Sequence, residues 1–483
     1  MMGFQNNDQD KIFISGFRLD DRVRKDHILR KISQKIDFDF IYDEVKETYG
    51  TNGNVSVPPP VILKLMLLLI IYNVRSEREL MLTLPERLDW LWFLGYDLED
   101  DIPTHSVLSK ARSRWGVETF QRFFERIVEQ CLEGGLIEGG TVFIDASLIE
   151  ADASNNSVVD RERMKGIFSK GYGELEKRLE EAAEKKTTQV NRKYISRTDP
   201  DASVTRHRVG TSKLRYKTHR VVDRRSEVIT ATKVTSGSVD DGEMLEEMVE
   251  RAKENTEREV ETVVADSRYG STRNYLYCHD KGIRAHMPSL EGTQRGTGRQ
   301  KGIFEKEEFC YDADRDVYLC PGGQELRRRN YHKGRGQYEY KASSKTCAGC
   351  ALSEQCTRSK YGRSVKRHIR QDALDRMRAM AGSREAKRDL RTRQHLSERS
   401  FAWSTRYGYK RARWRRVWRM EIQDYLVAAV QNITILANHS DRKPVGSNIQ
   451  RVQGVKSRFS HWIYVIVAGL CKKVSSETVF AYG

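Results

Sequence analysis

The alternation of strand-like and helical stretches over residues 139–291 constrains the fold most strongly. β-Branched and aromatic runs predict strands at 141–146, 215–222, 228–234, 261–266 and 283–287, and apolar periodicity predicts helices at 240–253 and 271–281. The second and third strands flank a turn at 223–226 and should form a hairpin. This order of strand, hairpin, helix, strand, helix and strand is typical of an α/β fold.

Helical patterns border the α/β segment on both sides. Residues before 135 carry apolar side chains three and four positions apart, without a convincing strand pair, and the same pattern returns after residue 383. The stretch before 383 is rich in Gly, Arg and Cys, which indicates a small inserted module. We therefore expect a helical domain at 1–135, an α/β core at 136–291 and 383–440, a Cys-rich insert at 292–382 and a C-terminal tail at 441–483.

Three local features refine this layout. Residues 174–186 predict a charged, solvated helix, and the apolar stretch 462–470 is expected to pack against the rest of the chain. Thr104 is a candidate N-cap for a basic helix that follows it. The basic helix would either enter a DNA groove or present an ordinary solvated face.

Charge and hydropathy narrow the class of protein. The chain has 85 Lys and Arg against 68 Asp and Glu, a net charge of +17, which favours a polyanionic partner. The longest apolar run, 61–72, is interrupted by Lys64 and falls short of the roughly 20 residues of a membrane span, so we expect a buried helix and no membrane partner. With no signal-peptide pattern and only eight cysteines in 483 residues, the sequence predicts a reducing cytoplasm.

Two aspartates stand at the ends of predicted strands. Asp145 ends the first strand and Asp266 ends the fourth, and ligands of open α/β sheets gather at the carboxyl ends of strands. A lone aspartate there would more often begin a turn. Two close carboxylates repel each other unless a cation lies between them, so the pair predicts Mg²⁺ or Mn²⁺. Two such ions roughly 3.5–4 Å apart can promote attack on a phosphodiester, and they usually need a third acidic ligand.

The candidate third acid is Glu398. It is the single acidic residue among ten Lys or Arg and six aromatic residues between Arg391 and Met420. A surface salt bridge to Arg399 or Arg406 is the alternative for Glu398, and Glu421 is the fallback ligand. The cations would contact phosphates while the aromatic rings stack on bases, although Phe401 and Trp418 are also candidates for the core. The predicted DNA-binding residues are Arg399, Arg406, Lys410, Arg411, Arg413, Arg415 and Arg416.

Four cysteines of the insert have metal-site spacing. Cys320, Cys347, Cys350 and Cys356 would close a tetrahedral structural Zn²⁺ site. The alternatives are free thiols, or a site that uses Cys310 or His368. Because the insert has too few apolar residues for a core of its own, we expect zinc to supply the missing folding energy. Cys131, Cys278 and Cys471 lie on apolar segments and should be buried thiols.

Taken in order, several motifs resemble one known family. They are FIDASLIEADAS at 143–154, YKTHRVVDRRSEVITATKVTSGSVDDGEML at 216–245, VVADSRYGS at 263–271, and the stretch around Glu398. Together they resemble the DDE transposases of bacterial insertion sequences, in the branch with a helical N-terminal domain and a cysteine-containing insert before the last acid. The resemblance extends from about Pro58 to Asn438.

The resemblance implies a ribonuclease-H-like core in which Asp145, Asp266 and Glu398 hold two divalent ions. It implies cleavage at the element's ends and strand transfer into target DNA. The helical domain would bind the terminal inverted repeats, and the protein would act on DNA as a homodimer or larger assembly. It would be associated with the bacterial nucleoid. The sequence departs from the family pattern at Gln394 and Thr405, where Arg and Lys are usual. A metal-dependent endonuclease without strand transfer and a DNA-binding protein with a decayed site remain the alternatives.

Overall fold

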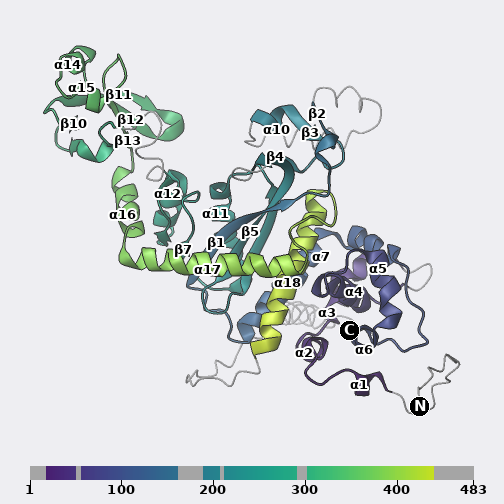
Figure 1. Ribbon diagram of the computed structural model, residues 1–483. Coiled ribbons are helices and arrows are strands. Elements are labelled where there is room, and N and C mark those ends of the chain that lie inside the picture. The colour runs from purple at the N-terminus through teal and green to yellow at the C-terminus, as the bar shows by residue number, and fades with distance from the viewer. Residues whose placement is uncertain (1–17, 51–55, 161–188, 207–210, 291–301, 440–483) are drawn as a thin grey trace, which may run out of the picture. The chain divides into compact units, whose positions relative to one another are not determined.

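The computed structural model describes residues 18–50, 56–160, 189–206, 211–290 and 302–439. It is a mixed α/β structure with a helical N-terminal region (Figure 1). The described residues all belong to one compact unit. The predicted helix at 174–186, the tail from 441 with its apolar stretch 462–470, and Cys471 lie outside the described residues.

The N-terminal region is helical, as predicted. Its α-helices are α1 (Leu19–Arg22), α2 (Ile28–Lys35), α3 (Phe40–Val45), α4 (Pro59–Ile71), α5 (Glu77–Thr83), α6 (Leu88–Leu94) and α7 (Ser106–Glu133). Gly116, at φ 75° and ψ 179°, interrupts α7, a conformation that suits a residue without Cβ. The N-cap of α7 is His105 and not Thr104, whose hydroxyl instead lies 3.0 Å from that of Ser106.

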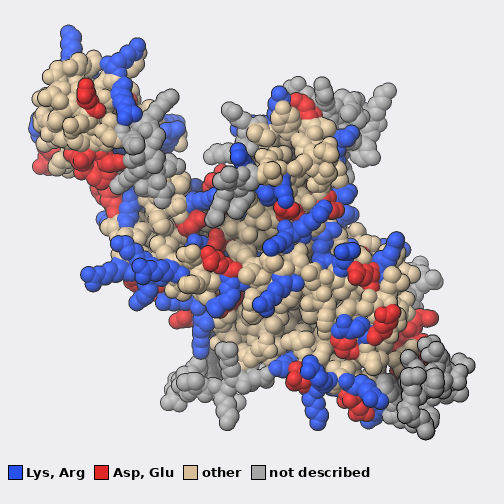
Figure 2. Space-filling view, in the orientation of Figure 1, with Lys and Arg blue, Asp and Glu red and all other residues tan. Residues whose placement is uncertain are grey.

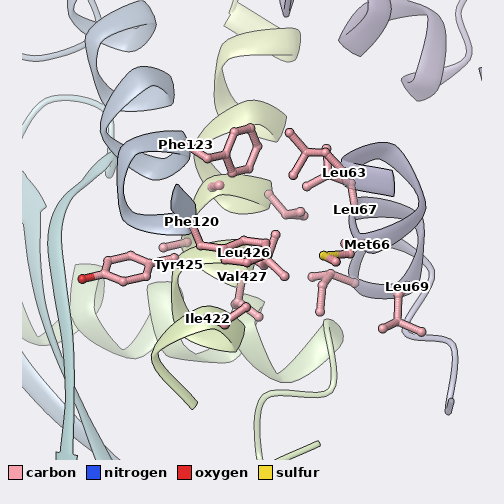
Figure 3. Close-up of a cluster of buried hydrophobic side chains, with 14 of the residues drawn as sticks. Leu63, Met66, Leu67, Leu69, Phe120, Phe123, Ile422, Tyr425, Leu426 and Val427 are labelled. Carbon is pink, nitrogen blue, oxygen red and sulfur yellow. The ribbon is translucent and has the colours of Figure 1, made fainter. Parts of the chain in front are cut away.

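Helix α4 forms the centre of the main hydrophobic core. Ten of its residues are buried, and in Figure 3 its leucines and Met66 face aromatic side chains of α7 and aliphatic side chains of α18 (Val417–His439). The apolar run is therefore a buried helix, as predicted, because neighbouring helices cover it on nearly every side. No helix within the described ranges is long and apolar enough to cross a membrane.

A six-stranded sheet forms the α/β part. Its strands are β1 (Thr141–Glu150), β4 (Ser203–Arg206), β5 (Ser212–Asp223), β6 (Ile229–Ser236), β7 (Thr262–Val264) and β8 (Arg284–His286). Strand β5 pairs antiparallel with β1 on one edge and with β4 and β6 on the other. Strands β7 and β8 continue the sheet in parallel with β1. All five predicted strands are present, and β4 was not foreseen.

Helices cover both faces of this sheet. On one face, α11 (Leu245–Thr256) and α12 (Thr272–Asp280) bury Val142 and Ile144 of β1. On the other, Leu396 of α17 (Arg384–Arg406) packs on Phe143, and α18 packs on β6. Successive residues of β1 therefore face opposite sides of the sheet. Asp145, two positions after Phe143, lies on the same side as Phe143, which α17 covers.

The Cys-rich segment forms a second, antiparallel sheet in the order β13-β12-β11-β10-β9. Its elements are β9 (Cys310–Asp312), β10 (Val317–Leu319), β11 (Glu325–His332), β12 (Gln337–Lys341), α14 (Ser344–Ala348), α15 (Ser353–Cys356) and β13 (Ser364–His368). Buried Phe309, Tyr318, Leu326 and Tyr340 give it a small core of its own. The expectation that this segment lacks a core was wrong, because aromatic residues replace the missing aliphatic run.

The remaining elements are short or connect the two sheets. Strands β2 (Val158–Asp160) and β3 (Tyr194–Ser196) pair with each other, next to α10 (Gln189–Lys193). Helix α16 (Gln371–Ala381) leads from the second sheet into α17, which runs across the first sheet in Figure 1. Helix α17 ends at Arg406, so the cationic run up to Arg416 is a loop.

Candidate active site

The sheet register places two aspartates at one level. Phe143 of β1 pairs with Val264 of β7, so Asp145 and Asp266 each follow this pair by two residues. Asp266 follows the end of β7, whereas Asp145 lies within β1, which continues to Glu150, so the prediction that Asp145 ends its strand was wrong. Burial raises the pKa of the Asp145 carboxyl group, and the charge of Asp266 adds to that rise. The structure thus brings these two predicted residues together.

Burial dominates the electrostatics of Asp145. Loss of solvent raises the pKa of its carboxyl group, and the guanidinium of Arg393, with Nη1 2.8 Å from Oδ2, opposes that effect. The backbone N–H of Ala146 donates to Oδ1 at 2.8 Å, and the Ser397 hydroxyl also lowers the pKa. Asp145 is therefore a carboxylate in a partly dry site, with one cation already against it.

A third carboxylate lies near this pair. Asp241 is buried, with Oδ1 2.5 Å from Lys217 Nζ and Oδ2 3.0 Å from Arg268 Nη1. Tyr269 is fully buried, and burial together with Asp241, Asp145 and Asp266 raises the pKa of its phenol well above the ordinary value. Its hydroxyl has no hydrogen-bond partner among the described residues. The charges of three carboxylates therefore act on a buried hydroxyl that has no hydrogen-bond partner among the described residues.

Glu398 lies on a different side of α17 from the residues that face Asp145. It is exposed, and Gln394 Nε2 donates to its Oε1 at 3.2 Å. Glu398 is five positions after Arg393, which corresponds to a rotation of roughly 140° about a helix with 3.6 residues per turn. Ser397 points to Asp145 in its place. The structure does not bring Glu398 to the two aspartates.

Two other acidic residues, Glu421 and Asp389, each have a basic partner. Glu421, the fallback ligand, pairs through Oε1 with Lys233 Nζ of β6 at 2.6 Å, and β5 separates β6 from β1. Asp389 on α17 is buried against His286 Nδ1 at 2.9 Å. Both carboxylates are therefore engaged by a basic side chain of a strand.

Several predicted DNA-binding cations are already paired. Arg399 binds Glu227, and both Arg411 and Arg415 bind Asp152, at 3.1 and 3.2 Å. Arg413 donates from Nη1 to the carbonyl of Val74 at 2.5 Å. The remaining cations predicted to bind DNA are Arg406, Lys410 and Arg416. Figure 2 shows Lys and Arg along α17 on the face in view.

The four cysteines predicted to bind zinc line one small cavity. The backbone N–H of Gln324 donates to Sγ of Cys320 at 3.3 Å, and that of Arg363 donates to Sγ of Cys347 at 3.5 Å. Burial and the three other cysteines raise the pKa of the Cys356 thiol, while Arg363 lowers it. Across the described ranges, however, no three His, Cys, Asp or Glu side chains are gathered closely enough to form a metal site.

The other predicted cysteines behave as expected where the structure describes them. Cys131 and Cys278 are buried, as predicted for ordinary core thiols. Cys310 is exposed, and neither it nor His368 lines the cavity of the four cysteines. The alternatives that use these two residues as zinc ligands therefore have less support than the predicted set.

Two family comparisons match the chain. Residues 17–114 match the family described as Transposase domain (DUF772), and residues 319–437 match the family described as Transposase DDE domain. The two matches support a DDE transposase of an insertion sequence. No curated protein matches this transposase, and no solved structure does.

Some of the predicted site residues lie inside the matched ranges and others lie outside them. The second match contains Glu398 and the four cysteines of the cavity, whereas Asp145 and Asp266 lie between the two matches. DDE transposases act on DNA and generally use divalent metal ions such as Mg²⁺. Carboxylate oxygens are what Mg²⁺ prefers, so the Asp145 and Asp266 pair fits such an ion chemically.

Sequence reasoning missed Arg393, Asp241 and Tyr269. Arg393 is one of many cations in its segment, and nothing in the sequence separates it from the others. Asp241 begins a short 3₁₀ helix five positions after the end of β6, so no strand-end signal marks it. Its place at the start of a predicted helix concealed it.

Proposed function

We propose that this transposase cuts DNA at the ends of its element and joins the freed 3′ hydroxyls to target DNA. The observation that carries the proposal is the pair Asp145 and Asp266, level with each other on adjacent parallel strands. A mixed sheet with acidic groups on its central strands supports the ribonuclease-H-like core that the family resemblance implies. A donor-plasmid assay tests the proposal: excised and integrated products are expected, whereas cutting alone would indicate a nuclease.

The residues of the site have separate tasks in this reaction. Asp145 and Asp266 would hold two divalent ions, which activate a water and then a 3′ hydroxyl and stabilise the departing oxygen. Arg393 keeps Asp145 ionised by its charge and must give up part of that contact when a cation enters. No covalent link between protein and DNA is required.

Glu398 would complete the site only after a movement of α17. A turn of about 100°, one residue of a helix, would put Glu398 where Ser397 now faces Asp145. Such a turn would also break the contact between Asp389 and His286, so DNA or metal binding would have to supply the energy. The alternative third ligand is Asp241, which already lies near the pair.

The variant Glu398→Gln tests this movement. We expect it to lower end cleavage at least about 100-fold, because even outer partners of metal ligands contribute 10–100-fold. The matched control is Glu385→Gln, the same substitution at a glutamate in the first turn of the same helix that pairs with Arg284, and it should leave cleavage unchanged. Cleavage at the normal rate by Glu398→Gln would assign the third position to another acid, and Asp241→Asn would then be the variant to test.

We also propose that the cysteines of the second sheet bind one structural zinc ion. Their shared cavity and the two N–H···S contacts support this, since such contacts favour thiolates. Elemental analysis of purified protein should find about one zinc per chain, and Cys347→Ser should lose it. Cys310→Ser, at an exposed cysteine of the same sheet, should keep it. Zinc retained by Cys347→Ser, or absent from the unaltered protein, contradicts the site.

A further inference from the structure

A large basic groove lies away from the aspartate pair. It is a cavity of about 1040 Å³, bordered by the start of α5, the first half of α7 and the segment before and at the start of α18. Its cationic lining residues are Arg75, Arg78, Lys110, Arg112, Arg114, Arg413 and Arg419. Glu77 is the one acid among the lining residues. We call this cavity the basic groove.

The single acid of the basic groove is already neutralised. Glu77 Oε1 lies 2.5 Å from Arg112 Nη2. Arg112 is 4% exposed, its guanidinium lies 4.0 Å from the Trp414 ring, and its other terminal nitrogen, Nη1, has no acceptor among the described residues. Burial lowers the pKa of Arg112, as does the like charge of Arg419. A buried, unsatisfied donor beside a second cation is costly unless an anion approaches.

Other cations of the groove are exposed and uncommitted. Arg75, Arg78 and Lys110 are exposed, and none forms an ion pair with any part of the chain that the structure describes. On the first half of α7, the lining residues Ser109, Lys110, Ser113 and Arg114 recur with a helical period and so share one face. Hydroxyl, ammonium and guanidinium donors on one helix face suit phosphate oxygens.

The basic groove is connected to the catalytic strand through the backbone. Glu150, the last residue of β1, donates its N–H to the carbonyl of Lys410 at 3.0 Å and accepts from the N–H of Ala412 at 2.7 Å. Arg413 and Trp414, which line the groove, follow directly. A ligand in the basic groove would therefore be held in a fixed relation to Asp145, five residues earlier on the same strand.

We propose that the basic groove binds the phosphate backbone of duplex DNA and holds it in register with the aspartate pair. The proposal rests on the proposed function, since it takes the reacting DNA as the ligand. The observations favour a polyanion with spaced charges over a small anion, because the cations extend over three separate elements. The groove residues would position the duplex and read no base sequence.

The test uses the full-length double variant Arg78→Ala/Lys110→Ala. The probe is a fluorescently labelled duplex of the DNA that flanks the gene, titrated by anisotropy at several salt concentrations. Removal of two phosphate contacts should reduce the slope of log K against log salt by about 1.8, or 0.9 per contact, and weaken binding about tenfold or more. The matched control is Arg329→Ala/Lys345→Ala, two exposed cations on β11 and α14, for which slope and affinity should stay unchanged.

An unchanged slope and affinity in Arg78→Ala/Lys110→Ala would overturn the proposal. The companion variant Asp145→Asn separates this result from a failure of the proposed function, since it should bind the same duplex as tightly as the unaltered protein without cutting it. Normal binding by the groove variant together with lost cleavage by Asp145→Asn would remove the groove assignment alone. Weak binding by the groove variant together with normal cleavage by Asp145→Asn would support the groove and contradict the active site.

Discussion

Asparagine in place of Asp145 is expected to lower end cleavage at least about 10³-fold, or about 4 kcal/mol of transition-state stabilisation. The substitution keeps the shape of the side chain and removes the charge that a divalent cation requires. DNA binding should stay within about twofold, because Asp145 lies in the sheet and not in the basic groove. Cleavage of a duplex that carries the element's end, followed on a denaturing gel with Mg²⁺, measures the change.

The control for Asp145→Asn is Asp280→Asn. Asp280 is an exposed aspartate of α12 that pairs with Arg370, and its neutralisation should not change cleavage. Asp266→Asn should be as defective as Asp145→Asn, since both residues would hold the same ions. Cleavage by Asp145→Asn at close to the normal rate would show that the reaction takes place elsewhere on the protein.

The second large effect is on stability and comes from a buried ionic network. Asp424 of α18 accepts from Arg220 Nη2 at 3.4 Å and from Thr218 Oγ1 at 3.0 Å, and it also accepts from Thr232. Arg220 in turn donates to Gln431 at 2.9 Å. Both charged side chains are 1% exposed. The network joins α18 to β5 and β6, and β5 pairs with β1, the strand that carries Asp145.

Replacing Asp424 with alanine should lower the free energy of unfolding by about 3–5 kcal/mol, because it leaves the Arg220 charge buried without a counterion. Urea denaturation followed by circular dichroism measures the loss. The double variant Arg220→Met/Asp424→Leu, which removes both charges, should recover much of it. A loss below about 1 kcal/mol in Asp424→Ala would mean that water reaches Arg220 and the network is not closed.

The core strands were predictable because their sequence signals are local. Short β-branched runs between turn residues located all five, and the observed strands shift the predicted bounds by only a few residues. The second sheet was not foreseen, since β11 is mostly charged and exposed, with little apolar alternation to find. The end of α17 at Arg406 was also not predicted from the sequence. Positive φ at Gly408 and Arg416 breaks a run of cations that contains no proline.

The candidate site was predictable only in part, for a related reason. Parallel pairing of β1 with β7 fixes the level of Asp145 and Asp266, although β1 continues five residues beyond Asp145. The rotation of α17 depends on long-range packing of Leu396 on Phe143 and of Ser404 near Arg220. No local signal reports that rotation, and it decides whether Ser397 or Glu398 faces the aspartates.

Calorimetric titration of the full chain with Mn²⁺ measures whether Asp145 and Asp266 together hold a divalent cation. Asp145→Asn and Asp266→Asn should each weaken Mn²⁺ binding at least about tenfold. The double variant should be scarcely weaker than either single one, since the two residues would share a site. Unchanged Mn²⁺ affinity in both single variants would mean that the two aspartates do not form a metal site.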